Sequence, residues 1–262
     1  MYDTRPIGVF DSGVGGLSVW KEIVKILPNE SVIYYADSAN CPYGSKKKHE
    51  IIALAKKNVD FLLEKQCKII VVACNTATAA AIDYLRDNYE VPFIGMEPAV
   101  KPASLKSKTK SIGVLATEGT FNGRLYQETT KRFARDVQVN IQVGEKLVDI
   151  VEKGLIYEEN TKAYLQELMN PLIEKNIDHL VLGCTHYPFL IPVLRELLPQ
   201  QVEILDPAFA VARQTKNILM QKRLIHQDAE KIQYEFYTTG DADILKSFLN
   251  KLTDKNYYLQ QV

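Results

Sequence analysis

The fold of this chain is decided by two stretches, KIIVVACNT at residues 68–76 and HLVLGCTH at residues 179–186. In each, a continuous apolar run ends in a cysteine that small polar residues follow. Continuous apolar runs of this length are typical of parallel strands that are covered on both faces. Open α/β sheets bind their ligands at the carboxyl ends of such strands. The sequence therefore predicts an α/β fold in which Cys74 and Cys184 each lie at a ligand-binding edge.

The similarity between the two halves extends beyond the cysteines. EPA at residues 97–99 follows Cys74 at nearly the same spacing as DPA at residues 206–208 follows Cys184, and IGVF at 7–10 recurs as IGVL at 112–115. We therefore predict two similar open parallel-sheet α/β domains that are related by internal duplication. The active site is expected in the cleft between them, where each half offers one cysteine.

The domain limits follow from the repeat. The first domain is expected to be discontinuous, with residues 1–98 plus 208–262 carrying Cys74, and the second to span residues 99–207 and carry Cys184. The tail after the second repeat contains a helical pattern whose apolar positions would be exposed unless they packed on the first half. These positions are Val211, Ile218 and Leu219.

Composition narrows the function classes. The 262 residues include 32 Lys and Arg against 32 Asp and Glu, and this zero net charge argues against nucleic acid as the main partner. No apolar run reaches the length of a membrane span, and the N-terminus lacks a signal-peptide pattern, so we expect a cytoplasmic protein. The four cysteines, at 41, 67, 74 and 184, lack metal-ligand spacing, so we expect free thiols and no metal.

Two thiols on opposite sides of a ligand suit proton abstraction from carbon with inversion. One thiolate would remove a proton while the other thiol delivers one to the opposite face. An unperturbed thiol, with a pKa of about 8.5, is only about 3% thiolate at neutral pH. A helix beginning directly after each cysteine would lower the thiol pKa. Asp11 and His186 could relay protons or tune the thiols.

Three other segments each have a functional and a plain structural interpretation. DSGVGG at residues 11–16 is neither a dinucleotide nor a Walker string, and it favours a polar anchor for an amino group or a tight turn with a helix N-cap. Tyr43 and Gly44 could offer a hydroxyl and a backbone N–H to a ligand, or could form an ordinary turn. Glu152 is a lone acid on a short helical segment, at the surface or in the site.

On a set of strings that spans almost the whole chain in order, the sequence resembles the aspartate/glutamate racemase family, and within it the glutamate racemases. The matching strings are VFDSGVGG (9–16), PYG (42–44), ACNTA (73–77), PAVKP (98–102), LAT (115–117), GCTHYP (183–188) and YTTGD (237–241).

The resemblance implies a glutamate racemase, an isomerase that interconverts L- and D-glutamate without a cofactor and supplies D-glutamate for peptidoglycan synthesis. Cys184 would deprotonate L-glutamate and Cys74 D-glutamate. The resemblance further implies a small-molecule substrate, a homodimer, and supporting acid/base roles for Asp11, Glu152 and His186. The substrate contacts it implies are Asp11, Ser12, Tyr43, Gly44, Asn75, Thr76, Thr185 and His186.

Cys41, Gly123 and Asp149 depart from the family pattern, and all three lie outside the cysteine-centred strings. Aspartate racemase is the nearest alternative, but it usually has Thr-Glu after its second cysteine, so Asp11 and His186 favour glutamate. A two-lobed protein that binds a small ligand, with incidental thiols, is an alternative of another class. Turnover of free amino acids distinguishes the two.

Overall fold

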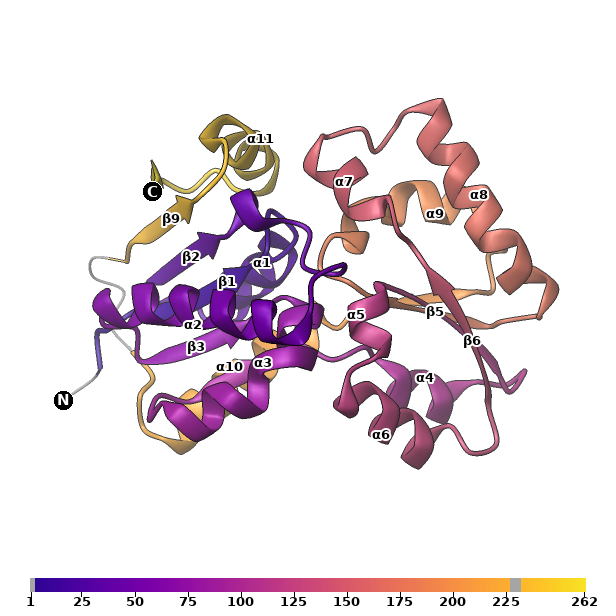
Figure 1. Ribbon diagram of the computed structural model, residues 1–262, viewed down its shortest axis with the longest axis horizontal. Helices are drawn as coiled ribbons and strands as arrows, with labels where there is room; N and C mark the ends of the chain where they lie inside the picture. The colour runs from indigo at the N-terminus through magenta and orange to yellow at the C-terminus, as the bar shows by residue number, and fades with distance from the viewer. Residues whose placement is uncertain (1–2, 227–231) are drawn as a thin grey trace.

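The computed structural model describes residues 3–226 and 232–262, which form two lobes that are each built on a parallel β-sheet (Figure 1). The first sheet has the strand order β10-β9-β2-β1-β3-β4, and the second has the order β6-β5-β7-β8. The second order repeats the β2-β1-β3-β4 part of the first, strand for strand. This repeat confirms the predicted fold class of two similar parallel α/β units related by duplication.

The strands of the first sheet consist mainly of buried apolar residues, because helices cover both of its faces. Alternate residues enter two separate cores. Val9 and Val71 face one core, whereas Phe10 and Val72 face the other. The strands are β1 (Ile7–Asp11), β2 (Val32–Ala36), β3 (Ile69–Val72), β4 (Phe93–Gly95), β9 (Tyr234–Thr238) and β10 (Tyr258–Gln261).

The helices of the first lobe divide between these two cores. On one face pack α1 (Leu17–Ile26), α10 (Ala208–Gln221) and α11 (Ala242–Leu252), and on the other α2 (Lys48–Glu64) and α3 (Asn75–Asn88). A short 3-10 turn, η1 (Ser38–Asn40), follows β2. The C-terminal part of the chain returns to this lobe, since β9 pairs with β2 and α10 packs against α1.

The second lobe repeats the arrangement around four strands. Apolar side chains of α4 and α6 cover one face of its sheet, and those of α7, α8 and α9 cover the other. Its elements are α4 (Val100–Lys106), β5 (Ser111–Ala116), α5 (Glu118–Phe121), α6 (Arg124–Phe133), β6 (Gln138–Val143), α7 (Leu147–Glu152), α8 (Glu159–Glu174), β7 (His179–Gly183), η2 (Tyr187–Leu190), α9 (Ile191–Leu197) and β8 (Glu203–Leu205).

The segment after Cys184 differs from the sequence prediction of one helix beginning at this cysteine. The chain first forms the 3-10 turn η2, and α9 begins only at Ile191. Pro188 and Pro192 explain the difference, because a proline lacks the N–H that an uninterrupted α-helix needs beyond its first turn. Cys74 therefore lies at the N-terminus of an α-helix, whereas Cys184 does not.

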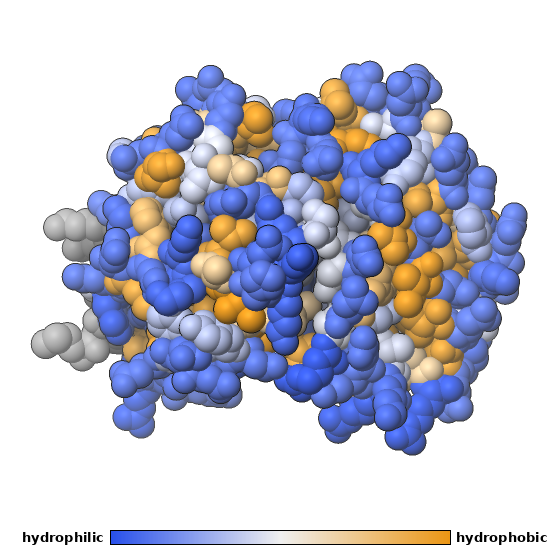
Figure 2. Space-filling view, viewed as in Figure 1, coloured by the Kyte–Doolittle hydropathy of each residue, from blue (hydrophilic) through white to orange (hydrophobic). Residues whose placement is uncertain are grey.

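The surface is largely hydrophilic, with apolar residues gathered over part of the second lobe in the view of Figure 2. β6 forms an edge of the second sheet, and its Ile141 is half exposed. Within the described ranges, no helix combines the length and apolar character needed to cross a membrane.

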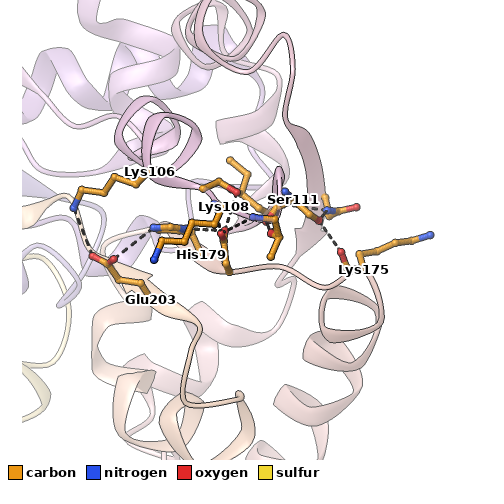
Figure 3. Close-up of polar contacts among 11 residues, drawn as sticks. Lys106, Lys108, Ser111, Lys175, His179 and Glu203 are labelled. Carbon is orange, nitrogen blue, oxygen red and sulfur yellow. Dashed lines mark hydrogen bonds and ion pairs between the residues drawn. The ribbon is translucent and has the colours of Figure 1, made fainter.

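A polar cluster joins the segment between α4 and β5 to the amino end of β7, which is the opposite end of this strand from Cys184 (Figure 3). Asp178 accepts hydrogen bonds from the Ser107 hydroxyl (2.8 Å) and from the backbone N–H groups of Lys108 (2.6 Å) and Thr109 (3.0 Å). The neighbouring His179 ring lies 2.8 Å from Asp178 and 3.5 Å from Glu203. Although partial burial opposes the effect, these hydrogen bonds hold the pKa of Asp178 below its usual value.

Replacing Asp178 by Asn should destabilise the fold by about 1–3 kcal/mol, because a neutral amide offers one acceptor oxygen, whereas the Ser107 hydroxyl and the two backbone N–H groups donate to different oxygens of the carboxylate. Urea denaturation of Asp178→Asn beside the exposed-site control Asp136→Asn measures the difference. Equal midpoints for the two variants would contradict this account of the cluster.

Candidate active site

Cys74 lies where β3 ends and α3 begins. Its Sγ caps the helix by accepting a hydrogen bond from the Ala77 N–H at 3.4 Å, and it lies 3.9 Å from the Ser12 hydroxyl. The residue is only 5% exposed. The first lobe therefore presents a thiol at the carboxyl edge of its sheet, where parallel sheets form their ligand sites.

Cys184 occupies the equivalent position in the second lobe, after β7, and is 7% exposed. Its Sγ lies 3.7 Å from Nδ1 of His186. Cys184 is close enough to Cys74 that its charge contributes to the raised pKa of that thiol, after the larger effects of burial and of Asp11. The two thiols thus approach one another from opposite lobes.

For Cys74, burial corrects the sequence prediction that a helix N-terminus would lower the thiol pKa. Desolvation raises the pKa of Cys74 far above its usual value, and the negative charge of Asp11 adds to the effect. The hydrogen bond from Ala77 acts in the opposite direction but is outweighed. A thiolate loses most of its hydration in this closed space, so Cys74 holds its proton.

The ring of His186 links Cys184 to Glu152. Its Nε2 lies 2.6 Å from Oε1 of Glu152, and that oxygen also accepts the N–H of Val14 at 2.7 Å. Burial disfavours a charged ring, but Cys184, Cys41 and Glu152 together raise the pKa of His186 well above its usual value. Burial likewise opposes the ionised form of Glu152, yet the hydrogen bond with His186 lowers the pKa of this carboxyl.

Asp11 is fully buried at the end of β1 and joins the lobes. Its Oδ1 accepts the hydroxyl of Thr185 at 3.1 Å, and its Oδ2 accepts the backbone N–H of Gly13 at 3.1 Å. Burial raises the pKa of Asp11, whereas the neighbouring His186 lowers it. A second contact between the lobes joins the hydroxyl oxygens of Thr76 and Thr117, which lie 2.9 Å apart.

The glycines of the 11–16 string are explained by close approach to the other lobe. A Cβ at Gly13 would overlap the Glu152 carboxylate, and a Cβ at Gly15 would overlap the ring of His186. The backbone of residues 11–16 therefore lies directly against Glu152, which ends α7, and His186, which follows β7. This role differs from the phosphate cradle that a glycine-rich turn commonly forms.

The remaining predicted contacts lie at the same edge, with one difference for Tyr43. Its hydroxyl is buried, donates to Asp37 and accepts from Asn58, so it is already engaged inside the first lobe. Gly44 lies against Thr117 of the second lobe. Asn75 is buried, and its Oδ1 has no hydrogen-bond partner in the described part of the chain.

A pocket of about 440 Å³ opens between the lobes beside this edge. Gly44 and Ala79 line it from the first lobe, and Gly119 and Gly123 from the second, while neither Cys74 nor Cys184 reaches it. Gly123 is compatible with this packing because a Cβ there would meet Ala79 at 2.5 Å.

Sequence reasoning assigned no role to Cys41 or Thr117, which the structure places among the predicted site residues. The Sγ of Cys41 lies 3.8 Å from Oε1 of Glu152. The available signals were the position of Cys41 directly before PYG and of Thr117 at the end of a family string. Glu152, which could have lain at the surface, is instead mostly buried against His186.

The fold and this paired-thiol arrangement are those expected of an amino-acid racemase, and comparison with known proteins agrees. The sequence model of the Asp/Glu/Hydantoin racemase family matches residues 7–215, and the chain belongs to this family. A glutamate racemase from Herpetosiphon aurantiacus is 44% identical over 237 residues, covering 90% of this chain and 93% of that protein.

Solved structures show the same relation. A glutamate racemase isoform from Bacillus anthracis superposes with a TM-score of 0.90 at 31% identity, covering 100% of this chain and 98% of that one. The Francisella tularensis glutamate racemase, in complex with D-glutamate, gives a TM-score of 0.84 at 31% identity, with 99% and 98% covered. The family resemblance inferred from the sequence is therefore confirmed.

Replacing Gly13 by Ala should destabilise the protein by about 1–3 kcal/mol, because the added methyl group displaces the Glu152 carboxylate. The cost should shrink in a Glu152→Ala background, where the overlapping atoms are gone. A double-mutant cycle by urea denaturation measures this coupling, with the exposed Glu118→Ala as the control background. Equal costs in the two backgrounds would contradict the close approach.

Proposed function

We propose that this protein interconverts L- and D-glutamate by a two-base proton transfer between Cys74 and Cys184. The observation that carries the proposal is the pair of buried thiols that two equivalent strands, β3 and β7, present from opposite lobes. The glutamate named in the structure of the Francisella relative, and the names of the curated relatives, support glutamate as the substrate.

In the proposed reaction, the Cys184 thiolate takes the Cα proton of L-glutamate, and the electron pair remains on the substrate as a carbanion-like transition state. The Cys74 thiol then delivers its proton to the opposite face, which yields D-glutamate and leaves Cys74 as the thiolate. The reverse reaction exchanges the two roles. Free N–H groups in the first turn of α3 would stabilise the developing negative charge.

The supporting groups divide between the two thiols. His186, held by Glu152, lies beside Cys184 and can stabilise its thiolate, because a cationic ring favours the negative sulfur. Asp11 acts on the other side, where its charge favours the protonated form of Cys74. We propose that both groups set the protonation states of the two thiols and do not react with the substrate carbon.

The substrate would be held at the meeting edge of the two lobes. The unpaired Oδ1 of Asn75 is an acceptor suited to the substrate ammonium group. Tyr43 would contribute its backbone, since its hydroxyl is engaged with Asp37 and Asn58. The other proposed contacts are Asp11, Ser12, Gly44, Thr76, Thr185 and His186. Because both thiols are buried, entry of glutamate would require the lobes to part.

The proposal also covers the domain limits, the oligomeric state and the cellular role of the protein. We propose two domains with the limits 1–98 plus 208–262 and 99–207, so that the chain crosses twice between parts that move relative to each other. We further propose a cytoplasmic homodimer that requires no cofactor and supplies D-glutamate for peptidoglycan. These points rest on the sequence repeat and on the family resemblance.

Heavy water tests the two-base mechanism. Early in the reaction, D-glutamate formed from L-glutamate should carry deuterium at Cα while the remaining L-glutamate stays protiated, because each thiol serves one face. Chiral separation with mass spectrometry measures the labels. Cys74→Ser and Cys184→Ser should each abolish racemisation almost completely, and Cys67→Ser, at a buried thiol away from the site, is the control. Early, equal labelling of both enantiomers would refute the paired thiols.

The raised pKa of Cys74 predicts a pH dependence. Below its pKa the thiolate fraction of Cys74 grows about tenfold per pH unit, so kcat/KM for D-glutamate, whose deprotonation needs this thiolate, should rise with pH across the neutral range. Thiolate absorbance titrated in the wild type and in Cys74→Ser gives the pKa of Cys74 by difference. A titration step below the usual thiol pKa of about 8.5 would contradict the effect of burial.

A further inference from the structure

Three potential metal ligands from separate elements converge beside the paired thiols. They are the Cys41 thiol after η1, the Glu152 carboxylate at the end of α7, and the His186 imidazole after β7. One ligand atom from each lies within 4.8 Å of the other two. The combination of sulfur, nitrogen and oxygen is the donor set that zinc prefers in proteins.

The spacing is close to what a tetrahedral zinc ion requires. With Zn–S near 2.3 Å and Zn–N and Zn–O near 2.0–2.2 Å, neighbouring donors lie about 3.3–3.6 Å apart. The Sγ of Cys41 is 3.8 Å from Oε1 of Glu152, and Nε2 of His186 is 2.6 Å from the same oxygen. The first distance must shrink by a few tenths of an ångström and the second must widen by about 0.7–1.0 Å, which rotation of the Glu152 and His186 side chains would have to supply.

The groups around these donors already orient them. The N–H of Val14 donates to the Glu152 carboxylate at 2.7 Å. The other ring nitrogen of His186, Nδ1, lies 3.5 Å from the Thr185 hydroxyl and 3.7 Å from the Cys184 sulfur. Outer contacts of this kind fix the orientation of metal-bound histidine and carboxylate groups. Cys41 and Glu152 each retain some exposure to solvent.

We propose that Cys41, Glu152 and His186 bind one Zn²⁺-like divalent cation, and that this cation inhibits the enzyme. The cation would occupy Nε2 of His186 and an oxygen of Glu152, and so would break the hydrogen bond between them. It would also place a positive charge beside Cys184. This charge would keep the two thiols in one protonation state. The cation is thus an inhibitor at this site, and the proposed racemisation does not use it.

Binding rests on the three donors alone, and only the inhibition rests on the proposed function. Cobalt(II) therefore serves as the first probe, because thiolate ligation gives it a charge-transfer absorption that requires no turnover. The wild type should bind one equivalent with this absorption. Cys41→Ala should lose the absorption and bind at least about tenfold more weakly, whereas the control Cys67→Ala should match the wild type.

Zinc gives the second measurement, with each variant compared with its own zinc-free rate. Inhibition by micromolar zinc should be retained in Cys67→Ala and lost in Cys41→Ala, and magnesium should inhibit neither because it avoids sulfur ligands. Undiminished cobalt binding by Cys41→Ala would overturn the proposal, as would binding that disappears in Cys74→Ser but persists in Cys41→Ala. Cobalt binding without inhibition would retain the site and overturn its inhibitory effect.

Discussion

The hydrogen bond between the Thr185 hydroxyl and the Asp11 carboxylate is the contact on which the arrangement of the site depends. It joins the carboxyl ends of two sheets that come from different halves of the chain. For these groups to meet, the backbone that follows Asp11 must lie directly against the second lobe. Only glycine permits this at positions 13 and 15, because a Cβ would overlap Glu152 or His186. The interlobe hydrogen bonds and the glycine-rich string therefore have one physical origin.

Closing two sheets against each other also sets the electrostatics. Removal of water raises the pKa values of Asp11 and Cys74, since both ionised forms lose hydration. Burial acts to lower the pKa of His186, but this pKa is also raised because anionic partners surround the ring and favour its charged form. The result is a space in which one imidazole is held cationic between a carboxylate and a thiol. Such a concentration of perturbed titratable groups is typical of sites that move protons.

Much of the fold could be predicted from the sequence because its signals are local and repeated. The apolar runs before Cys74 and Cys184 identify buried parallel strands, and their duplication implies two similar sheets. The prediction failed after Cys184, where two prolines delay the helix until Ile191. It also failed for the Cys74 pKa, since the effect of the helix N-terminus is visible in the sequence but the burial of the thiol is not.

The site shows the same division. The sequence alone determined the α/β class, the duplication and the family. It also placed Cys74, Cys184, Asp11 and His186 at or just after strand ends. These features follow from patterns of neighbouring residues. Only the tertiary structure decided that Glu152 pairs with His186, that Tyr43 directs its hydroxyl inward, and that Cys41 joins them. The reason is physical: these contacts link residues far apart in the chain, and their geometry exists only when the two sheets meet.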